Sequence, residues 1–452
     1  MDVVVIDTPS LGDRSYLVHD GTSALVVDPQ RDIDRVLAAA DQAGVRITHV
    51  AETHLHNDYV TGGLALANQL GVPYLVAADA DVQFEREPIT DQQELQVGEL
   101  QVTVVATPGH TDNHVSYVVR HGGRQAVFSG GSLLFGSVGR TDLLGPELTD
   151  RLTHEQWHSV RRLADQADDQ AELYPTHGFG SFCSSGPATG AASSTIAEQR
   201  AHNHALTDSD VEHFVRELIA GLSAYPAYYA HMGPANAKGP QALDLTLPAP
   251  VDADVLRQRI EDGQWVVDLR NRVAFSTSHL AGTVSFEYGN GSMFTTFLGW
   301  LAPWGQPLTL LGSKDDVSAA FRDLSRIGID RPDVAIGENP SGIAPELATA
   351  SYPHVSWDEL AASRGGSDVV VLDVRRTDEF EQSHIQGAVN VPLHELEARI
   401  GDVPAGQVWV HCGSGYRSSI AASLLQRAGR DVCYVDGNFP DAASHGLPVV
   451  PA

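Results

Sequence analysis

An internal repeat in the last 200 residues is the feature that most constrains the fold of this chain of 452 residues. Two strand-like runs, WVVDLR and VVVLDVR, are followed by the related segments HLAGTV and HIQGAV. Regular spacing in similar hydrophobic contexts predicts a duplication, and therefore two sister α/β domains. The matched positions all lie 105 residues apart: Asp268, Leu269, Arg270, His279 and Gly282 correspond to Asp373, Val374, Arg375, His384 and Gly387.

The first 180 residues alternate β-branched runs such as SALVVD and LQVTVVAT with helical stretches such as DIDRVLAAADQAG. This alternation predicts a layered α/β fold. Pro- and Gly-rich segments near residue 245 and between residues 340 and 352 indicate boundaries. We therefore predict three domains, at 1–245, 246–345 and 352–452, as the length also suggests at roughly 100–200 residues per domain.

Composition excludes several classes of protein. Lysine plus arginine is 29 and aspartate plus glutamate is 58, giving a net charge of −29 that repels nucleic acid and anionic membrane surfaces. The N-terminus does not have the pattern of a signal peptide, and no apolar run approaches the ~20 residues that span a membrane. Three cysteines are too few for a disulfide framework, so we expect a cytoplasmic protein.

Histidines follow several of the predicted strands in the first domain. His54, His56 and Asp58 lie in ETHLHND, His110 lies in TPGHT, and His177 lies in YPTHG. If strand geometry persists, the first two imidazoles leave on the same side of the chain. Several neutral imidazoles with a carboxylate predict a Zn, Fe or Mn site.

A cysteine in the last domain has an unusual setting. QVWVHCGSGYRSSIAASLLQRAG is typical of a buried strand, a short loop and a helix. Backbone N–H groups, the positive end of a helix dipole and a nearby arginine favour the thiolate form of a cysteine. A C-x5-R phosphatase loop is the alternative, but the spacing here is C-x4-R. We call residues 412–417 the cysteine loop and predict that Cys412 and Arg417 are catalytic, with the cradle formed by Gly413, Ser414, Gly415 and Tyr416.

The histidine motifs carry a family resemblance. THLHNDY resembles the H-x-H-x-D-H signature of the metallo-β-lactamase superfamily, and PGHT and YPTHG resemble its later histidine motifs. The run FSGGSLLFGSVGRTDL is similar to the G-D and G-R-x-D stretch of persulfide dioxygenases. The resemblance spans about residues 1–240 and implies an αββα sandwich.

Two positions depart from the pattern. Tyr59 replaces the last histidine of the signature, which in the binuclear hydrolases of the superfamily binds the second metal. Gly131 replaces an aspartate, which in those hydrolases bridges both metals. Persulfide dioxygenases hold one iron with two histidines and that aspartate. Of these three ligands, the resemblance leaves only the two histidines in this chain, as His54 and His110. We expect His56 to complete the site, while water in the third position and a metal-free site remain open alternatives.

The resemblance implies one Fe(II) per chain held by His54, His56 and His110, with zinc as an alternative. On this mapping, replacing His177 with alanine should change metal content little, and Gly131→Asp should increase iron retention. The residues expected to support the site or contact substrate are Asp58, Tyr59, Arg140, Asp142 and His177.

The cysteine loop, with DVR and HIQGAVNVP upstream, resembles a rhodanese domain over about residues 352–452. In rhodaneses the cysteine carries sulfane sulfur as a persulfide. Gly312 stands at the equivalent position of the sister domain, which resembles the inactive rhodanese homology domain that often accompanies an active one. We therefore expect one active and one inactive copy.

Together the resemblances imply a persulfide dioxygenase–rhodanese fusion that oxidises a low-molecular-weight thiol persulfide with O2 to sulfite and forms thiosulfate at Cys412. Two alternatives remain. One is a sulfurtransferase or sulfur carrier whose first domain is inactive. The other is a thioester hydrolase similar to glyoxalase II, which would need a second metal at Asp58 and His177. We also expect a homo-oligomer.

Overall fold

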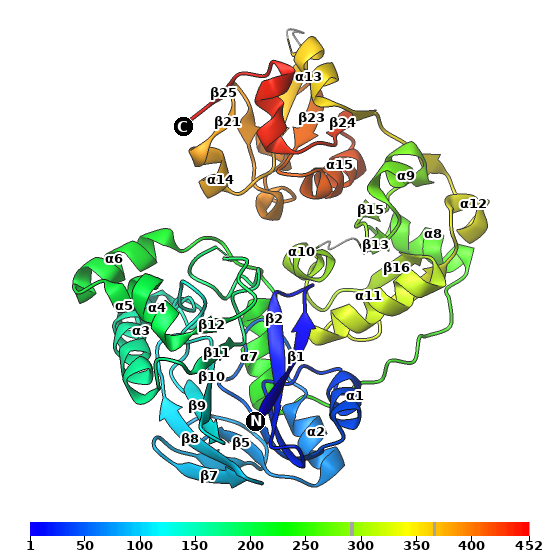
Figure 1. The fold of residues 1–452 in the computed structure, drawn as a ribbon. Coiled ribbons are helices and arrows are strands. Elements are labelled where there is room, and N and C mark those ends of the chain that lie inside the picture. The colour runs from blue at the N-terminus through cyan, green and yellow to red at the C-terminus, as the bar shows by residue number, and fades with distance from the viewer. Residues whose placement is uncertain (188, 290–292, 365–367, 452) are drawn as a thin grey trace. The chain divides into compact units, whose positions relative to one another are not determined.

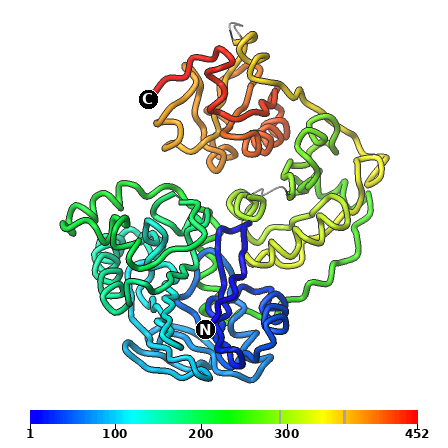
Figure 2. The backbone as a smooth tube through the Cα atoms, viewed as in Figure 1, coloured from blue at the N-terminus to red at the C-terminus, as the bar shows by residue number. Residues whose placement is uncertain are grey.

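The computed structural model describes residues 1–187, 189–289, 293–364 and 368–451. The chain divides into two compact units, one formed by Met1–Asp244 with Leu324–Gly328 and the other by Leu245–Asp323 with Ile329–Ala452. Figure 2 traces residues 1–244 of the first unit from blue to green, and the second unit runs from green to red. The division into domains at 1–245, 246–345 and 352–452 stays a prediction.

Two six-stranded sheets form the first unit (Figure 1). The first sheet has the order β1-β2-β3-β4-β5-β6 and the second the order β12-β11-β10-β9-β8-β7. Their strands are β1 (Asp2–Thr8), β2 (Asp13–His19), β3 (Ser23–Val27), β4 (Arg46–Ala51), β5 (Tyr74–Ala77), β6 (Glu87–Ile89), β7 (Glu94–Val97), β8 (Leu100–Ala106), β9 (Val115–His121), β10 (Arg124–Gly130), β11 (Glu172–Pro175) and β12 (Ser194–Thr195).

Helices cover the outer faces of these sheets. Val36 of α1 and Leu66 of α2 belong to the core of the first sheet, whereas Val160 of α3 and Phe214 of α6 pack against the second. This arrangement confirms the predicted αββα sandwich. The helices of the unit are α1 (Asp34–Ala43), α2 (Gly63–Leu70), α3 (Pro146–Gln166), α4 (Ile196–His202), α5 (His204–Thr207), α6 (Val211–Gly221) and α7 (Tyr229–Lys238).

The second unit contains two parallel sheets with the same strand order. The earlier sheet is β15-β13-β16-β17, and the later sheet repeats this order as β22-β20-β23-β24 with β19 added at its edge. A two-stranded ribbon accompanies each, β14-β18 and β21-β25. The strands are β13 (Trp265–Asp268), β14 (His279–Leu280), β15 (Val284–Ser285), β16 (Leu308–Gly312), β17 (Asp333–Ile336), β18 (Thr349–Ala350), β19 (His354–Val355), β20 (Val369–Asp373), β21 (His384–Ile385), β22 (Val389–Asn390), β23 (Gln407–His411), β24 (Val432–Val435) and β25 (Val449–Val450).

The repeated residues make equivalent contacts in the two halves. Arg270 Nη2 donates a hydrogen bond to Asp268 Oδ2 at 2.6 Å. In the later half, Arg375 Nη2 donates to Asp373 Oδ2, also at 2.6 Å. The structure therefore supports the duplication. The helices of the unit are α8 (Ala253–Glu261), α9 (Arg272–Thr277), α10 (Phe294–Leu301), α11 (Lys314–Arg326), α12 (Pro340–Ile343), α13 (Trp357–Ser363), α14 (Thr377–Gln382) and α15 (Tyr416–Arg427), with 3-10 turns at Leu393–Glu395, Ile400–Asp402 and Phe439–His445. Among the described residues, none of the chain's helices combines the length and apolar character needed to cross a membrane.

Candidate metal centre and cysteine loop

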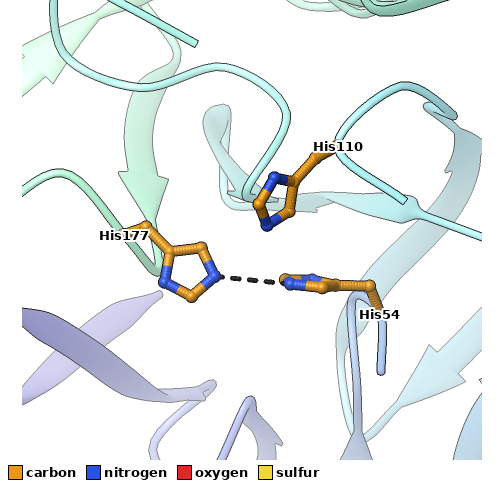
Figure 3. A group of neighbouring side chains, drawn as sticks. All are labelled: His54, His110 and His177. Atoms are coloured by element: carbon orange, nitrogen blue, oxygen red, sulfur yellow. Dashed lines mark hydrogen bonds between the residues drawn. The ribbon is translucent and has the colours of Figure 1, made fainter. Parts of the chain in front are cut away.

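Three histidines converge inside the first unit. His54 follows β4, His110 follows β8 and His177 follows β11. Figure 3 shows their imidazoles turned toward one another, with His177 Nε2 facing His54 Nε2 at 3.3 Å. One nitrogen from each ring lies within 4.8 Å of the others. All three side chains are buried, so we call this triad the candidate metal centre.

Hydrogen bonds fix the protons on two of these rings. His110 Nδ1 donates to the carbonyl of Arg140 at 2.7 Å, which leaves Nε2 as a lone pair without a partner in the described structure. Thr53 Oγ1 donates to Asp28 and therefore accepts from His54 Nδ1 at 2.9 Å. Burial lowers the pKa of His110 to about 3, and burial with neighbouring histidines holds the pKa of His54 well below its usual value. Both rings are therefore neutral, and each can offer the lone pair of Nε2 to a metal ion.

The third ring is held by two carboxylates. His177 Nδ1 lies 2.9 Å from Asp13 Oδ1 and 3.0 Å from Asp58 Oδ2. Burial alone would lower the pKa of His177, but the charge of Asp58 and the hydrogen bond to Asp13 raise it to about 10, so a metal ion bound here would replace the proton on Nε2 while Nδ1–H keeps its carboxylates. Burial and Asp58 also raise the pKa of Asp13 to about 8, so Asp58 carries the negative charge of the pair. A carboxylate behind a histidine is the usual support of a metal ligand.

The donor set fits a metal ion. Nitrogens bound at about 2.0–2.1 Å to one tetrahedral ion are about 3.4 Å apart, close to the 3.3 Å between His54 Nε2 and His177 Nε2. His110 Nε2 has no hydrogen-bond partner among the described residues, so its lone pair is available to a metal ion. Imidazole nitrogens suit zinc and ferrous iron alike, so the geometry selects a metal site without selecting the metal.

His56 faces a different set of groups. Its Nε2 lies 3.2 Å from Glu52 Oε2, 3.4 Å from Asp28 Oδ1 and 2.9 Å from the hydroxyl of Tyr59. Burial would lower the pKa of His56, but Asp28 and Glu52 raise it to about 9, so the ring is protonated and paired. Among the described residues, His56 does not form a metal-sized group with His54 and His110. The reason is local: β4 ends at Ala51, so strand geometry does not extend to these histidines.

The structure contradicts the expectation for Gly131→Asp. A β-carbon on Gly131 would overlap the ring of His110, so an aspartate there would displace the ligand that it was meant to join. The preceding Gly130 has a φ of +54°, which also favours glycine. The Gly131 N–H donates to His114 Nε2 at 3.0 Å. The position therefore supports the site through its backbone.

Sequence reasoning missed four supporting residues. His114 is buried and stacks on His54, with ring centroids 4.8 Å apart. Asp28 accepts a hydrogen bond from Thr53 Oγ1, and the oriented hydroxyl in turn holds the ring of His54. Asp28 follows a strand-like run and Glu52 is the first residue of ETHLHND, so both had a visible signal, whereas Asp13 and His114 lie outside the quoted motifs. The four residues are Asp13, Asp28, Glu52 and His114.

The GRTD segment supports His110. Arg140 is 2% exposed, and its guanidinium forms two hydrogen bonds with Asp142, at 2.7 and 2.8 Å. Arg140 is therefore a buried residue whose guanidinium is paired with Asp142. Because its carbonyl accepts the His110 proton, Arg140 fixes which nitrogen of His110 faces the triad.

The cysteine loop follows β23 in the second unit and runs into α15, whose first two residues are Tyr416 and Arg417, as the predicted order of strand, loop and helix requires. Cys412 is buried, and its Sγ accepts the N–H of Gly415 at 3.2 Å and lies 3.5 Å from Ser418 Oγ. Gly415 has a φ of +90°, which turns its N–H back toward the sulfur at little steric cost. The N–H of Gly415 is a donor that suits a thiolate or a persulfide at Cys412.

Arg417 has a partner that the sequence did not indicate. Its guanidinium lies 2.5 and 2.8 Å from the carboxylate of Glu379 in α14. Burial would lower the pKa of Arg417, but the hydrogen bond to Glu379 and the charge of Cys412 raise it above its ordinary value. Arg417 is thus a fixed cation whose charge is partly balanced. In the sister half, β16 ends at Gly312 and α11 begins at Lys314, so no comparable loop forms.

Family models match both ends of the chain. Residues 12–178 match the metallo-beta-lactamase superfamily, and residues 356–445 match the rhodanese-like domain. The chain is a metallo-beta-lactamase–rhodanese fusion. The candidate metal centre lies in the first part of the fusion and the cysteine loop in the second.

The relatives of the fusion include two groups of enzymes. It is 31% identical to the hydroxyacylglutathione hydrolase of Rhizobium johnstonii over 179 residues, 38% of the fusion, and spans 64% of the length of that hydrolase. It is 27% identical to the mitochondrial persulfide dioxygenase ETHE1 of Homo sapiens over 243 residues, 52% of the fusion and 82% of that protein. A metallo-beta-lactamase from Staphylococcus aureus has the same fold, with a TM-score of 0.67, 24% identity, and coverage of 75% of the fusion and 99% of that chain.

Proposed function

We propose that the fusion is an enzyme of sulfane-sulfur metabolism that oxidises a thiol persulfide to sulfite and then forms thiosulfate. The observation that carries this proposal is a compact three-histidine site in the same chain as a glycine-rich cysteine loop. Enzyme families at both ends of the chain support catalysis. The likeness to persulfide dioxygenase ETHE1 supports the choice of substrate.

We assign the metal ligands as His54, His110 and His177, in place of the set with His56. These three histidines would hold the ion, and ferrous iron bound there would supply the redox chemistry that O2 needs. The chain's own residues orient the site: Asp58 and Asp13 hold the Nδ1 proton of His177. Burial of the three rings excludes bulk water from the ligand side chains.

The first reaction converts RSSH, O2 and H2O to RSH, sulfite and two protons. It oxidises the outer sulfur and reduces O2. In the second reaction, the sulfur of sulfite attacks the outer sulfur of a Cys412 persulfide. A new S–S bond forms in thiosulfate, while the bond to Cys412 breaks and leaves its electron pair on Sγ. The Gly415 N–H stabilises the departing thiolate.

A thioester hydrolase is the second candidate, because hydroxyacylglutathione hydrolases are relatives of similar identity. His56, Asp58 and His177 also form a metal-sized group, which a binuclear site would use. Against it, the hydroxyl of Tyr59 hydrogen-bonds to His56, and His110 fills the space in which an aspartate at position 131 would stand. A sulfur carrier with an inactive first unit is the third candidate.

One experiment separates these functions. The full chain is purified without added metal, its metals are measured, and it is then supplied with a thiol persulfide under an oxygen electrode. We expect about one iron per chain, O2 uptake, and sulfite or thiosulfate as product. Hydrolysis of a hydroxyacylglutathione without O2 uptake would identify the hydrolase, and sulfur transfer without O2 uptake the carrier. A cytoplasmic location and a homo-oligomeric state are further parts of the proposal, the second testable by light scattering.

A further inference from the structure

The half without a cysteine contacts the helix that follows the cysteine loop. Within the second unit, the N–H of Ser285 donates to Ser423 Oγ of α15 at 3.0 Å. One turn further along α15, Gln426 lies 2.8 Å from His279 Nε2. These contacts hold α15, whose N-terminal end closes the cysteine loop, against the earlier half.

A charged residue of the earlier half reaches closer to the loop. Arg272, at the start of α9, places its Nε 3.2 Å from Asp436 Oδ1 and its Nη1 2.5 Å from Glu287 Oε2. Glu287 belongs to the same half as Arg272, whereas Asp436 follows β24 of the later half. The guanidinium therefore bridges the two halves through a pair of carboxylates.

Asp436 in turn touches the backbone of the cysteine loop. Its Oδ1 occupies the space that a β-carbon on Gly415 would need. The N–H of Gly415 is the one that donates to Cys412 Sγ. A carboxylate at this position has two effects. It limits the movement of Gly415, and its negative charge opposes a thiolate at Cys412 unless a cation balances it.

The other charged or titratable groups around Cys412 are largely balanced. Arg417 is paired with Glu379. His411, just before the cysteine, is buried and neutral because burial lowers its pKa. Tyr434 is a buried phenol whose pKa burial and Asp436 raise. Around Asp436 itself, His354 Nε2 is 3.8 Å from Oδ2, farther than Arg272 is from Oδ1.

We propose that Arg272 of the cysteine-free half is a positioning residue for sulfur transfer, acting by holding and neutralising Asp436 against Gly415. The earlier half then contributes to the reaction although it has no nucleophile. This inference rests on the sulfur-transfer part of the proposed function and does not depend on the metal centre.

The test uses opposite charge changes in the full chain. Alkylation of Cys412 by iodoacetamide is followed against pH by peptide mass spectrometry in Arg272→Ala, Arg272→Lys and Asp436→Asn. Arg272→Ala should move the midpoint upward by about half a pH unit, because Asp436 loses its cation. Asp436→Asn should move it downward, and Arg272→Lys should stay near the wild type. Arg257→Ala, which removes an exposed ion pair with Asp254, is the matched control.

Thiosulfate–cyanide transfer provides the second readout. Arg272→Ala should lower kcat about threefold at a pH below the midpoint, with partial rescue in Arg272→Lys. If Arg272→Ala matches Arg257→Ala, or if Arg272→Ala and Asp436→Asn shift the midpoint in the same direction, the inference is overturned. If Arg272→Ala does not fold, Asp436→Asn still tests the inference, because an alkylation midpoint that does not move downward in this variant would overturn it. Absence of transfer in the wild type would instead refute the proposed sulfur transfer, while the alkylation profiles would still report on Arg272.

Discussion

The cysteine loop takes its sulfur and its main donors from residues 412–417, whereas the candidate metal centre joins His54 to His177, 123 residues away. In the loop, a strand, a glycine-rich turn and a helix define the geometry locally. In the metal centre, groups from other segments orient two of the rings, since Arg140 holds His110 and Asp13 holds His177. The contrast teaches that a short motif can specify one site, while the other depends on the packing of two sheets.

The largest effect should come from the local site. Cys412→Ser should reduce thiosulfate–cyanide transfer by more than about 1000-fold, because no other group there can carry the sulfur. Metal content should not change. Cys433→Ser is the control, since burial raises the pKa of Cys433 to about 11 and leaves it a thiol. Transfer that survives in Cys412→Ser would refute the assignment of the nucleophile.

The next effect tests the assembled site. His110→Ala and His177→Ala should each reduce bound metal below about a tenth of an equivalent, because each removes one of three donors. For His177 this reverses the expectation from the sequence. Metal analysis after desalting measures the change, with sulfur transfer by Cys412 as the check on folding. Full metal content in His177→Ala would contradict the role of His177 and indicate His56 as the third metal ligand.

A smaller effect should follow from the support of His177. Asp58→Asn should weaken metal affinity by about 10–100-fold, because the amide is a poorer acceptor for the Nδ1 proton. Competition with a chelator measures the affinity. Asp112→Asn, which alters an exposed ion pair with Arg151 in the same unit, is the control. Equal affinities in the two variants would show that the carboxylate does not support a ligand.

The smallest effect on metal should come from His56. His56→Gln should change metal affinity by less than about threefold, because the ring is paired with Asp28 and Glu52. It should lower the free energy of unfolding by about 3 kcal/mol, since those buried carboxylates lose their cation. Urea unfolding and metal analysis measure the two quantities. Loss of metal with unchanged stability would contradict this role.

Much of the fold could be predicted because its signals are periodic or repeated. The 105-residue offset predicted two sister halves, and the structure gives them the same strand order. The strand, loop and helix around Cys412 could be predicted because they are consecutive in the chain. The pairing of Arg417 with Glu379 could not be predicted, because α14 and the cysteine loop meet only in the folded chain.

The sequence indicated which histidines lie close together but not how their imidazole rings are oriented. It favoured His56 by assuming an extended strand, although β4 ends before His54. It treated Gly131 as a missing ligand, because a sequence does not show that the ring of His110 fills that space. The carboxylates Asp13 and Asp58 on His177 depend on β2 meeting the loop after β4, a contact set by tertiary packing.

We propose that one chain combines a single-metal histidine site with a separate cysteine loop. Metal stoichiometry in the wild type and in His177→Ala tests it most directly, with thiosulfate–cyanide transfer measured on the same samples. We expect about one iron per wild-type chain, almost none in His177→Ala, and equal transfer in both. Two metals per wild-type chain, or one metal retained in His177→Ala, would contradict it.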